Sequence, residues 1–151
     1  MEGPLASTVW PRTPIPENVK RLLLRFLHLI DLNDPHAGRA LADEVFSSNG
    51  VFQSPGGLFR GSQDIILCRE DAWNTIASRS HTIDKVFSGN ADGTELIVVG
   101  KLFTQTKDTL ASTAVEFSAQ VEIEASDASS PRMKTWKAYS GNRIQSGMQK
   151  A

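Results

Sequence analysis

Two charged side chains in the predicted second helix are candidates for holding a substrate oxygen. Arg39 lies seven residues before Phe46, so a helix over residues 34–48 places it nearly over that phenylalanine on the apolar face. Its guanidinium either reaches water and pairs with Asp43 four residues on, or projects into a cavity and binds an anionic or carbonyl oxygen. In the second interpretation both residues are catalytic, and Asp43 orients or charge-balances Arg39.

His81 is the residue best suited to moving a proton near neutral pH. It opens a strand-like segment and alternates with Ile83, which favours an inward side chain. An inward imidazole is a candidate general acid or base, and the alternative is a hydrogen-bonded histidine of the core or rim. Ser54, directly before a Pro-Gly-Gly turn, offers a hydrogen bond to a bound molecule.

The composition argues against several kinds of partner. The 151 residues include 16 lysines and arginines and 17 aspartates and glutamates, with no basic cluster. Nucleic acid and anionic membranes both bind basic faces, so neither is an expected partner. The single cysteine, Cys68, cannot form an intrachain disulfide, and three scattered histidines do not have zinc-binding spacing. We therefore expect a cytoplasmic protein that uses no cofactor and no metal.

The chain divides into an arm, one domain and a tail. Residues 1–16 are rich in proline and contain no apolar run long enough for a signal peptide or a membrane span. This extended arm is either a disordered tail, so that deletion of residues 1–15 leaves the core folded, or an arm anchored on a partner subunit by Trp10. Residues 17–145 form the domain, and residues 146–151 form a C-terminal tail.

Hydrophobic spacing predicts three helices followed by four long strands. Apolar residues recur at helical spacing over residues 17–30, a second helix covers 34–48, and a third begins near Gly61 and carries Trp73 near its apolar face. The period then changes to two over residues 80–89, 94–106, 112–125 and 132–141. This order indicates an α+β fold in which a curved antiparallel sheet wraps around three N-terminal helices.

Two segments resemble the SnoaL-like superfamily, which includes ketosteroid isomerase, scytalone dehydratase, polyketide cyclases and nuclear transport factor two. They are FSSNGVFQSPGGLFRGSQDII at residues 46–66 and WKAYSG at residues 136–141. The resemblance implies a cone-shaped domain over most of the chain. It also implies that Ser54 replaces the isomerase's general-base aspartate, Phe26 its oxyanion tyrosine and Ala119 its buried carboxyl. The proton shuttle of that isomerase is therefore absent.

The same resemblance, with strand alternation, predicts which side chains line the cone. If Ala119 points inward, Glu116 and Gln120 point outward. The inward aromatic side chains then suit a bulky, largely apolar ligand, although core packing is the simpler interpretation for any one of them. They are Phe52, Trp73, Phe103, Phe117 and Trp136.

Together these features favour a cofactor-free isomerase or cyclase. Its expected substrate is a bulky polyketide-, terpenoid- or alkaloid-like intermediate of secondary metabolism, as for the small cofactor-free members of fungal pathways that this chain resembles. The alternative is a non-catalytic module of the same fold that binds a small molecule or assembles with a protein. Both interpretations imply a homodimer formed through the outer face of the sheet.

Overall fold

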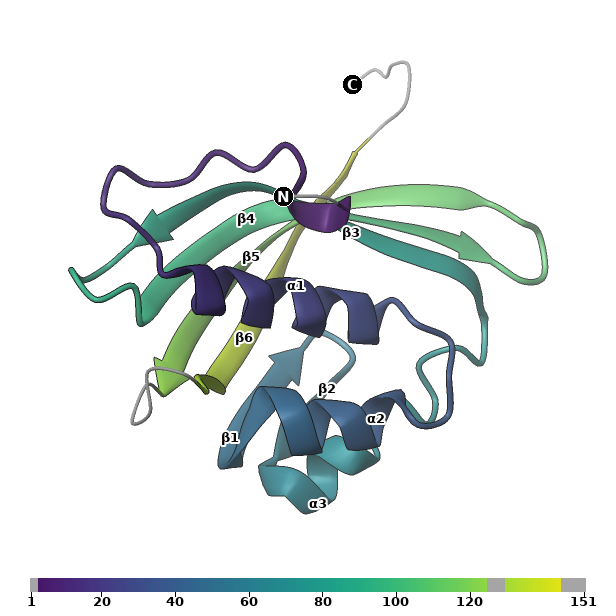
Figure 1. Ribbon diagram of the computed structural model, residues 1–151. Helices are drawn as coiled ribbons and strands as arrows, with labels where there is room; N and C mark the ends of the chain where they lie inside the picture. The colour runs from purple at the N-terminus through teal and green to yellow at the C-terminus, as the bar shows by residue number, and fades with distance from the viewer. Residues whose placement is uncertain (1–2, 125–129, 145–151) are drawn as a thin grey trace.

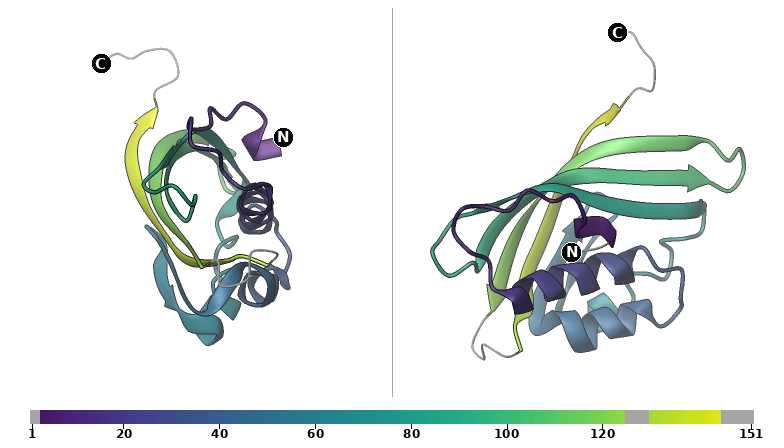
Figure 2. Two further views of the ribbon diagram at one scale, coloured as in Figure 1. Left: turned by 60° about the vertical axis from the view of Figure 1, so that its left-hand side comes forward. Right: turned by 45° about the horizontal axis from the view of Figure 1, so that its top comes forward.

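The computed structural model describes residues 3–124 and 130–144 of the chain. One strongly curved sheet surrounds the first helix on its concave side, and the other two helices lie beside one end of the sheet (Figure 1, Figure 2). This α+β arrangement confirms the predicted fold class.

The first helix, α1, spans Glu17–Ile30 as predicted. It forms because its apolar residues recur every three or four positions and are buried on one side, whereas His28 is exposed. The buried side chains are Val19, Leu22, Leu23, Phe26, Leu27, Leu29 and Ile30. No helix in the described part of the chain has both the length and the apolar character needed to cross a membrane.

The second helix is shorter than predicted. α2 spans Ala37–Ala40 and continues as a π-helical turn, η2, over Leu41–Val45. Asp34 lies before the helix, where its Oδ1 accepts a hydrogen bond of 2.7 Å from the backbone N–H of His36. The helix ends at Val45 because the next residue, Phe46, begins the strand β1, Phe46–Ser54.

The third helix is also shorter than predicted, since α3 spans only Gly61–Ile66. The chain then forms a loop over residues 67–75, in which the side-chain amide of Asn74 donates to Asp71 at 3.2 Å. Trp73 therefore lies on a loop and not on the face of a helix.

The four predicted long strands are present. They are β3, Ile76–Ser88; β4, Glu95–Thr106; β5, Ser112–Glu124; and β6, Arg132–Ile144. With β1 and the short β2, Gly57–Arg60, they form one sheet in the order β2-β1-β6-β5-β4-β3. Strands β1 and β6 pair in parallel, so the sheet is mixed and not antiparallel throughout.

Local irregularities accompany the curvature of the sheet. The β3–β4 register shifts between Ile83 and Lys85, and a β-bulge of this kind bends a strand. Gly100 of β4 permits a close approach, because a Cβ there would collide with the carbonyl oxygen of Thr82 and crowd the ring of Phe117. The inner face is consequently concave and buried, and along β5 the buried Ala119 alternates with exposed residues such as Gln120, as predicted.

The N-terminal arm packs on its own domain. Leu5 ends a short 3₁₀ turn, Gly3–Leu5, and is only 1% exposed. The backbone of Val9 makes two hydrogen bonds of 3.0 Å to β3, one to Asp84 and one from Val86. Trp10 packs against the core, with the ammonium of Lys20 4.5 Å from its ring centroid. Neither of the two expected arrangements, a disordered tail or an arm on a partner, describes these contacts.

Candidate active site

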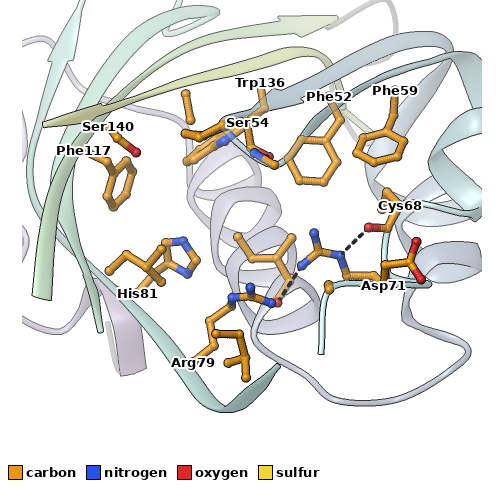
Figure 3. Close-up of a pocket in the computed structure, with 18 of the residues that line it drawn as sticks. Phe52, Ser54, Phe59, Cys68, Asp71, Arg79, His81, Phe117, Trp136 and Ser140 are labelled. Carbon is orange, nitrogen blue, oxygen red and sulfur yellow. Dashed lines mark hydrogen bonds between the residues drawn. The ribbon is translucent and has the colours of Figure 1, made fainter. Parts of the chain in front are cut away.

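A cavity of about 550 Å³ opens between the concave face of the sheet, the end of α1 and the loop 67–75 (Figure 3). Its volume lies within the usual range for small-molecule sites. Slightly more than half of the lining surface is apolar, and the polar or charged side chains include Ser54, Arg69, Asp71, Thr75, Arg79, His81 and Ser140.

His81 enters this cavity from β3 and is held by Asp31. The Nδ1 atom of His81 lies 2.6 Å from Oδ1 of Asp31, and the backbone N–H of His81 donates to Oδ2 of the same carboxylate at 2.8 Å. The imidazole is only 11% exposed, and the ring of Phe117 meets it edge-on at 5.4 Å. Because the carboxylate accepts a hydrogen bond from Nδ1, the neutral ring has its proton there and leaves the lone pair of Nε2 as the base.

Asp31 is placed by the end of α1. It is the residue directly after Ile30, and its backbone N–H still bonds to helix carbonyls. A carboxylate at a helix C-terminus meets the negative end of the helix dipole. The two hydrogen bonds from His81 satisfy the carboxylate at this otherwise unfavourable position.

Arg69 fastens the loop 67–75 to the same end of α1. Its Nη1 donates to the carbonyl oxygen of Ile30 at 3.0 Å, and its Nε donates to the carbonyl of Cys68 at 3.3 Å, as the dashed lines in Figure 3 show. The guanidinium also lies 5.7 Å from the ring centroid of Phe52. Arg69 therefore caps a helix C-terminus and adds a fixed positive charge to the cavity wall.

Arg79 is a second cation in the cavity wall, two residues before His81 on β3. Its guanidinium lies over the ring of Trp73, 5.0 Å from the centroid. Nη1 is buried and has no hydrogen-bond acceptor among the described residues, and the same is true of the indole Nε1 of Trp73. Burial lowers the pKa of the Arg79 guanidinium, and the nearby charge of Arg69 lowers it further, whereas Asp31 opposes both effects.

Cys68 also lines the cavity, but its thiol is not activated. Burial raises the pKa of this thiol, and the neighbouring Arg69 offsets only part of the effect. A protonated thiol is a poor nucleophile, so the arrangement does not favour covalent chemistry at Cys68. Residues 3–124 and 130–144 contain no group of three or more histidine, cysteine, aspartate or glutamate side chains arranged to hold a metal ion.

Similarity to known proteins is confined to structure. No protein-family model matches the sequence, and no curated protein matches it. A proposed scytalone dehydratase from Novosphingobium aromaticivorans superimposes with a TM-score of 0.69 at 12% identity, covering 89% of each chain. The hexachlorocyclohexane dehydrochlorinase LinA-type3 from Novosphingobium barchaimii gives 0.67 at 12% identity, over 88% of this chain and 91% of that one.

A third structure, a proposed SnoaL-like polyketide cyclase from Shewanella denitrificans, gives a TM-score of 0.62 at 10% identity, over 83% of this chain and 92% of that one. The chain has the SnoaL-like fold. At these identities the comparisons establish the fold alone, and the chemistry of this chain has to be argued from its own residues.

Five of the predicted site residues do lie at the cavity. They are Phe52, Ser54, His81, Phe117 and Trp136. The rings of Phe117 and Trp136 are 6.3 Å apart and form part of the aromatic wall. Ser54 Oγ accepts a hydrogen bond of 3.3 Å from the backbone N–H of Gly56, which orders the Pro-Gly-Gly turn at the rim.

The structure does not bring the other four predicted residues to the cavity lining. Arg39 and Asp43 are both exposed and belong to α2 and η2, whose buried faces are formed by other residues. Phe103 is 40% exposed, since the alternation of β4 turns Leu102 to the cavity instead. Trp73 lies on the loop 67–75, where its ring contacts the guanidinium of Arg79.

The polar residues of the site that were not predicted include Asp31, Arg69 and Arg79. A signal for Arg79 was present, because alternation puts it on the same side of β3 as His81. An acidic residue at the predicted end of a helix, as Asp31 is, breaks the usual charge preference and so was a second signal in the sequence. Nothing in the local pattern distinguishes Arg69, whose partner Ile30 is 39 residues away.

Proposed function

We propose that this SnoaL-like protein is a cofactor-independent isomerase or cyclase that moves a proton on a bulky, largely apolar substrate. The substrate class we propose is a polyketide-, terpenoid- or alkaloid-like intermediate of secondary metabolism. The observation that carries the proposal is the 2.6 Å contact between Nδ1 of His81 and Asp31 at the wall of an apolar cavity.

In the proposed reaction His81 is the general base. Nε2 removes a proton from a carbon next to a carbonyl group, and the electron pair of the broken C–H bond moves onto the carbonyl oxygen as an enolate. Asp31 keeps its hydrogen bond to Nδ1 and stabilises the imidazolium that forms. When the enolate is conjugated with a C=C bond, return of the proton from His81 to the far carbon of that dienolate completes an isomerisation. In a cyclisation the enolate carbon attacks a second carbonyl carbon of the substrate, the π bond of that carbonyl breaks, and the alkoxide that forms takes the proton from His81.

Two cationic side chains in the cavity wall, Arg79 and Arg69, stabilise the negative charge of the proposed enolate. Arg79 lines the cavity and its Nη1 has no acceptor among the described residues, and Arg69 contributes a charge fixed by its two bonds to carbonyls. Donors held in advance toward a developing negative charge lower the barrier, because they need no reorganisation during the reaction. The aromatic walls exclude water and so strengthen both interactions.

The solved structures with this fold are consistent with such chemistry. They include a dehydrochlorinase and proposed dehydratase and cyclase proteins. We also propose that two copies of the chain pair through the outer face of the sheet, where several large apolar side chains are exposed.

The experiment that tests the proposal measures a general base directly and needs no knowledge of the natural substrate. The probe is 5-nitrobenzisoxazole, an apolar compound whose C–H proton is taken by a base as its N–O bond breaks, which releases a coloured cyanonitrophenolate. We expect the wild-type protein to accelerate this release, and His81→Gln to lower the rate by about 100-fold, the usual contribution of a general base.

The matched control is His28→Gln, because His28 is an exposed histidine of α1 outside the cavity lining. This variant should retain the wild-type rate. Equal rates for wild type and His81→Gln would contradict the proposal and would favour the alternative of a module that only binds its ligand.

A further inference from the structure

We propose that the molecule bound by this cavity carries a carboxylate, and that Arg79 is the residue that binds it. This inference deepens the proposed function by naming the charge of the substrate. It concerns binding alone, so it can be tested even if His81 performs no chemistry.

Arg79 is the member of the site whose donors are still available. Its Nη1 is buried and has no acceptor among the described residues, although its side chain lines the cavity. Because Nη1 itself is shielded from the cavity, a bound anion pairs with the part of the Arg79 side chain that lines the cavity, where the guanidinium charge has no acceptor among the described residues. The contact with Trp73, 5.0 Å from the ring centroid, restricts the movement of the guanidinium, whose planar fork suits a carboxylate.

The charges around Arg79 favour an anion over a neutral oxygen. Arg69 lies close enough to disfavour the protonated form of Arg79, and its N–H groups are used by the carbonyls of Ile30 and Cys68. Asp31, the carboxylate that acts on Arg79, is hydrogen-bonded to His81, and Asp71 is the only acidic side chain in the described cavity lining and is itself exposed. Two cations thus face the cavity without a dedicated counter-ion.

The rest of the lining defines the body of the ligand. Phe117 and Trp136 form one side, and Phe52 and Phe59 form another, with ring centroids of the last two 6.0 Å apart (Figure 3). Surfaces of this kind bind ring-containing or branched hydrocarbon groups. The cavity therefore fits an amphipathic acid with an apolar body and a single anionic end.

The test uses two fluorescent probes with one skeleton. 8-Anilino-1-naphthalenesulfonate carries an oxyanion that stands in for the carboxylate, and N-phenyl-1-naphthylamine lacks it. We expect the wild type to bind the anionic probe about tenfold more tightly than the neutral one, and Arg79→Gln to lose that preference with little change for the neutral probe.

Two controls keep the interpretation specific. Arg39→Gln removes the same charge from an exposed position outside the cavity lining and should leave both affinities unchanged. His81→Gln should retain the preference for the anion, so loss of catalysis and loss of anion binding are distinguishable.

A measurement on the wild type alone covers the case in which Arg79→Gln does not fold. The carboxylate 2-naphthoate should displace the anionic probe at a concentration about tenfold lower than the neutral 2-acetonaphthone requires. Equal displacement by the two compounds, equal binding of the two probes, or binding of neither would overturn the proposal. So would a folded Arg79→Gln protein that keeps the preference.

Discussion

A carboxylate at the C-terminal end of a helix is unfavourable unless other groups compensate for it, and Asp31 occupies such a position after α1. Both of its oxygens bond to one residue, His81, through the backbone N–H and through Nδ1. Two bonds from one carboxylate fix the position of the strand and the orientation of the ring together. In the proposed reaction Asp31 is therefore a positioning residue, and His81 is the group that meets the substrate.

The sequence predicted a histidine and a guanidinium at the cavity, but it indicated the wrong arginine and did not indicate the aspartate. Alternation along β3 correctly predicted that His81 points inward, because this prediction depends only on the neighbouring residues. The guanidinium expected from Arg39 is supplied instead by Arg69 and Arg79. Asp31 and His81 are 50 residues apart, and such a contact depends on how α1 meets the sheet, which a local pattern does not contain.

Among the elements, those with a long regular period were predicted well and those set by tertiary contacts were not. Helix α1 and strands β3 to β6 have apolar periods that a single packing surface imposes. α2 and α3 are short because Phe46 begins a strand and because the loop 67–75 is held by Arg69 instead of continuing the helix. The arm contacts its own domain through two buried apolar residues, Leu5 and Ile15, which a proline-rich sequence without an apolar period does not single out.

The packing of the arm on its domain predicts that the arm contributes to the free energy of unfolding. Leu5→Ala should lower the free energy of unfolding by about 2–4 kcal/mol, since it empties a fully packed site. Urea unfolding followed by circular dichroism measures the change.

The control is Val9→Ala in the same arm, where the side chain is 56% exposed although the backbone pairs with β3. This change should cost no more than about 0.5 kcal/mol. Two variants of equal stability would show that the arm adds nothing to the core, and deletion of residues 1–15 would then be harmless as first expected.

At the scale of the whole molecule, the curved sheet separates two surfaces with different roles. Its concave side surrounds α1 and ends in the cavity, whereas its convex side leaves large apolar side chains in solvent. Phe87 is 46% exposed and pairs across the strands with Ile97, which is 41% exposed, and Tyr139 on β6 is 50% exposed. An apolar surface spread over several strands is typical of a face that pairs with another protein surface.

We therefore predict a dimer in sedimentation velocity at micromolar concentration, and a shift to monomer for Ile97→Asp. A charge placed in the middle of an apolar interface has to be desolvated, which weakens association. Leu58→Asp is the control, because Leu58 is similarly exposed at 45% but lies on β2 at the opposite edge of the sheet. A wild-type protein that sediments as a monomer would remove the dimer from this account.

The central claim is that Asp31 holds the imidazole of His81 so that Nε2 is a base in an apolar cavity. The most direct test of this claim is to determine which nitrogen of the neutral His81 ring carries the proton. This position is measured by the nitrogen NMR shifts of protein labelled with ¹⁵N-histidine, in slightly alkaline solution. We predict that the neutral His81 ring has its proton on Nδ1, that the exposed His28 and His36 provide internal references, and that Asp31→Asn abolishes this form. A proton found on Nε2 of the wild-type ring would contradict the account, because that nitrogen would then have no lone pair with which to accept a proton.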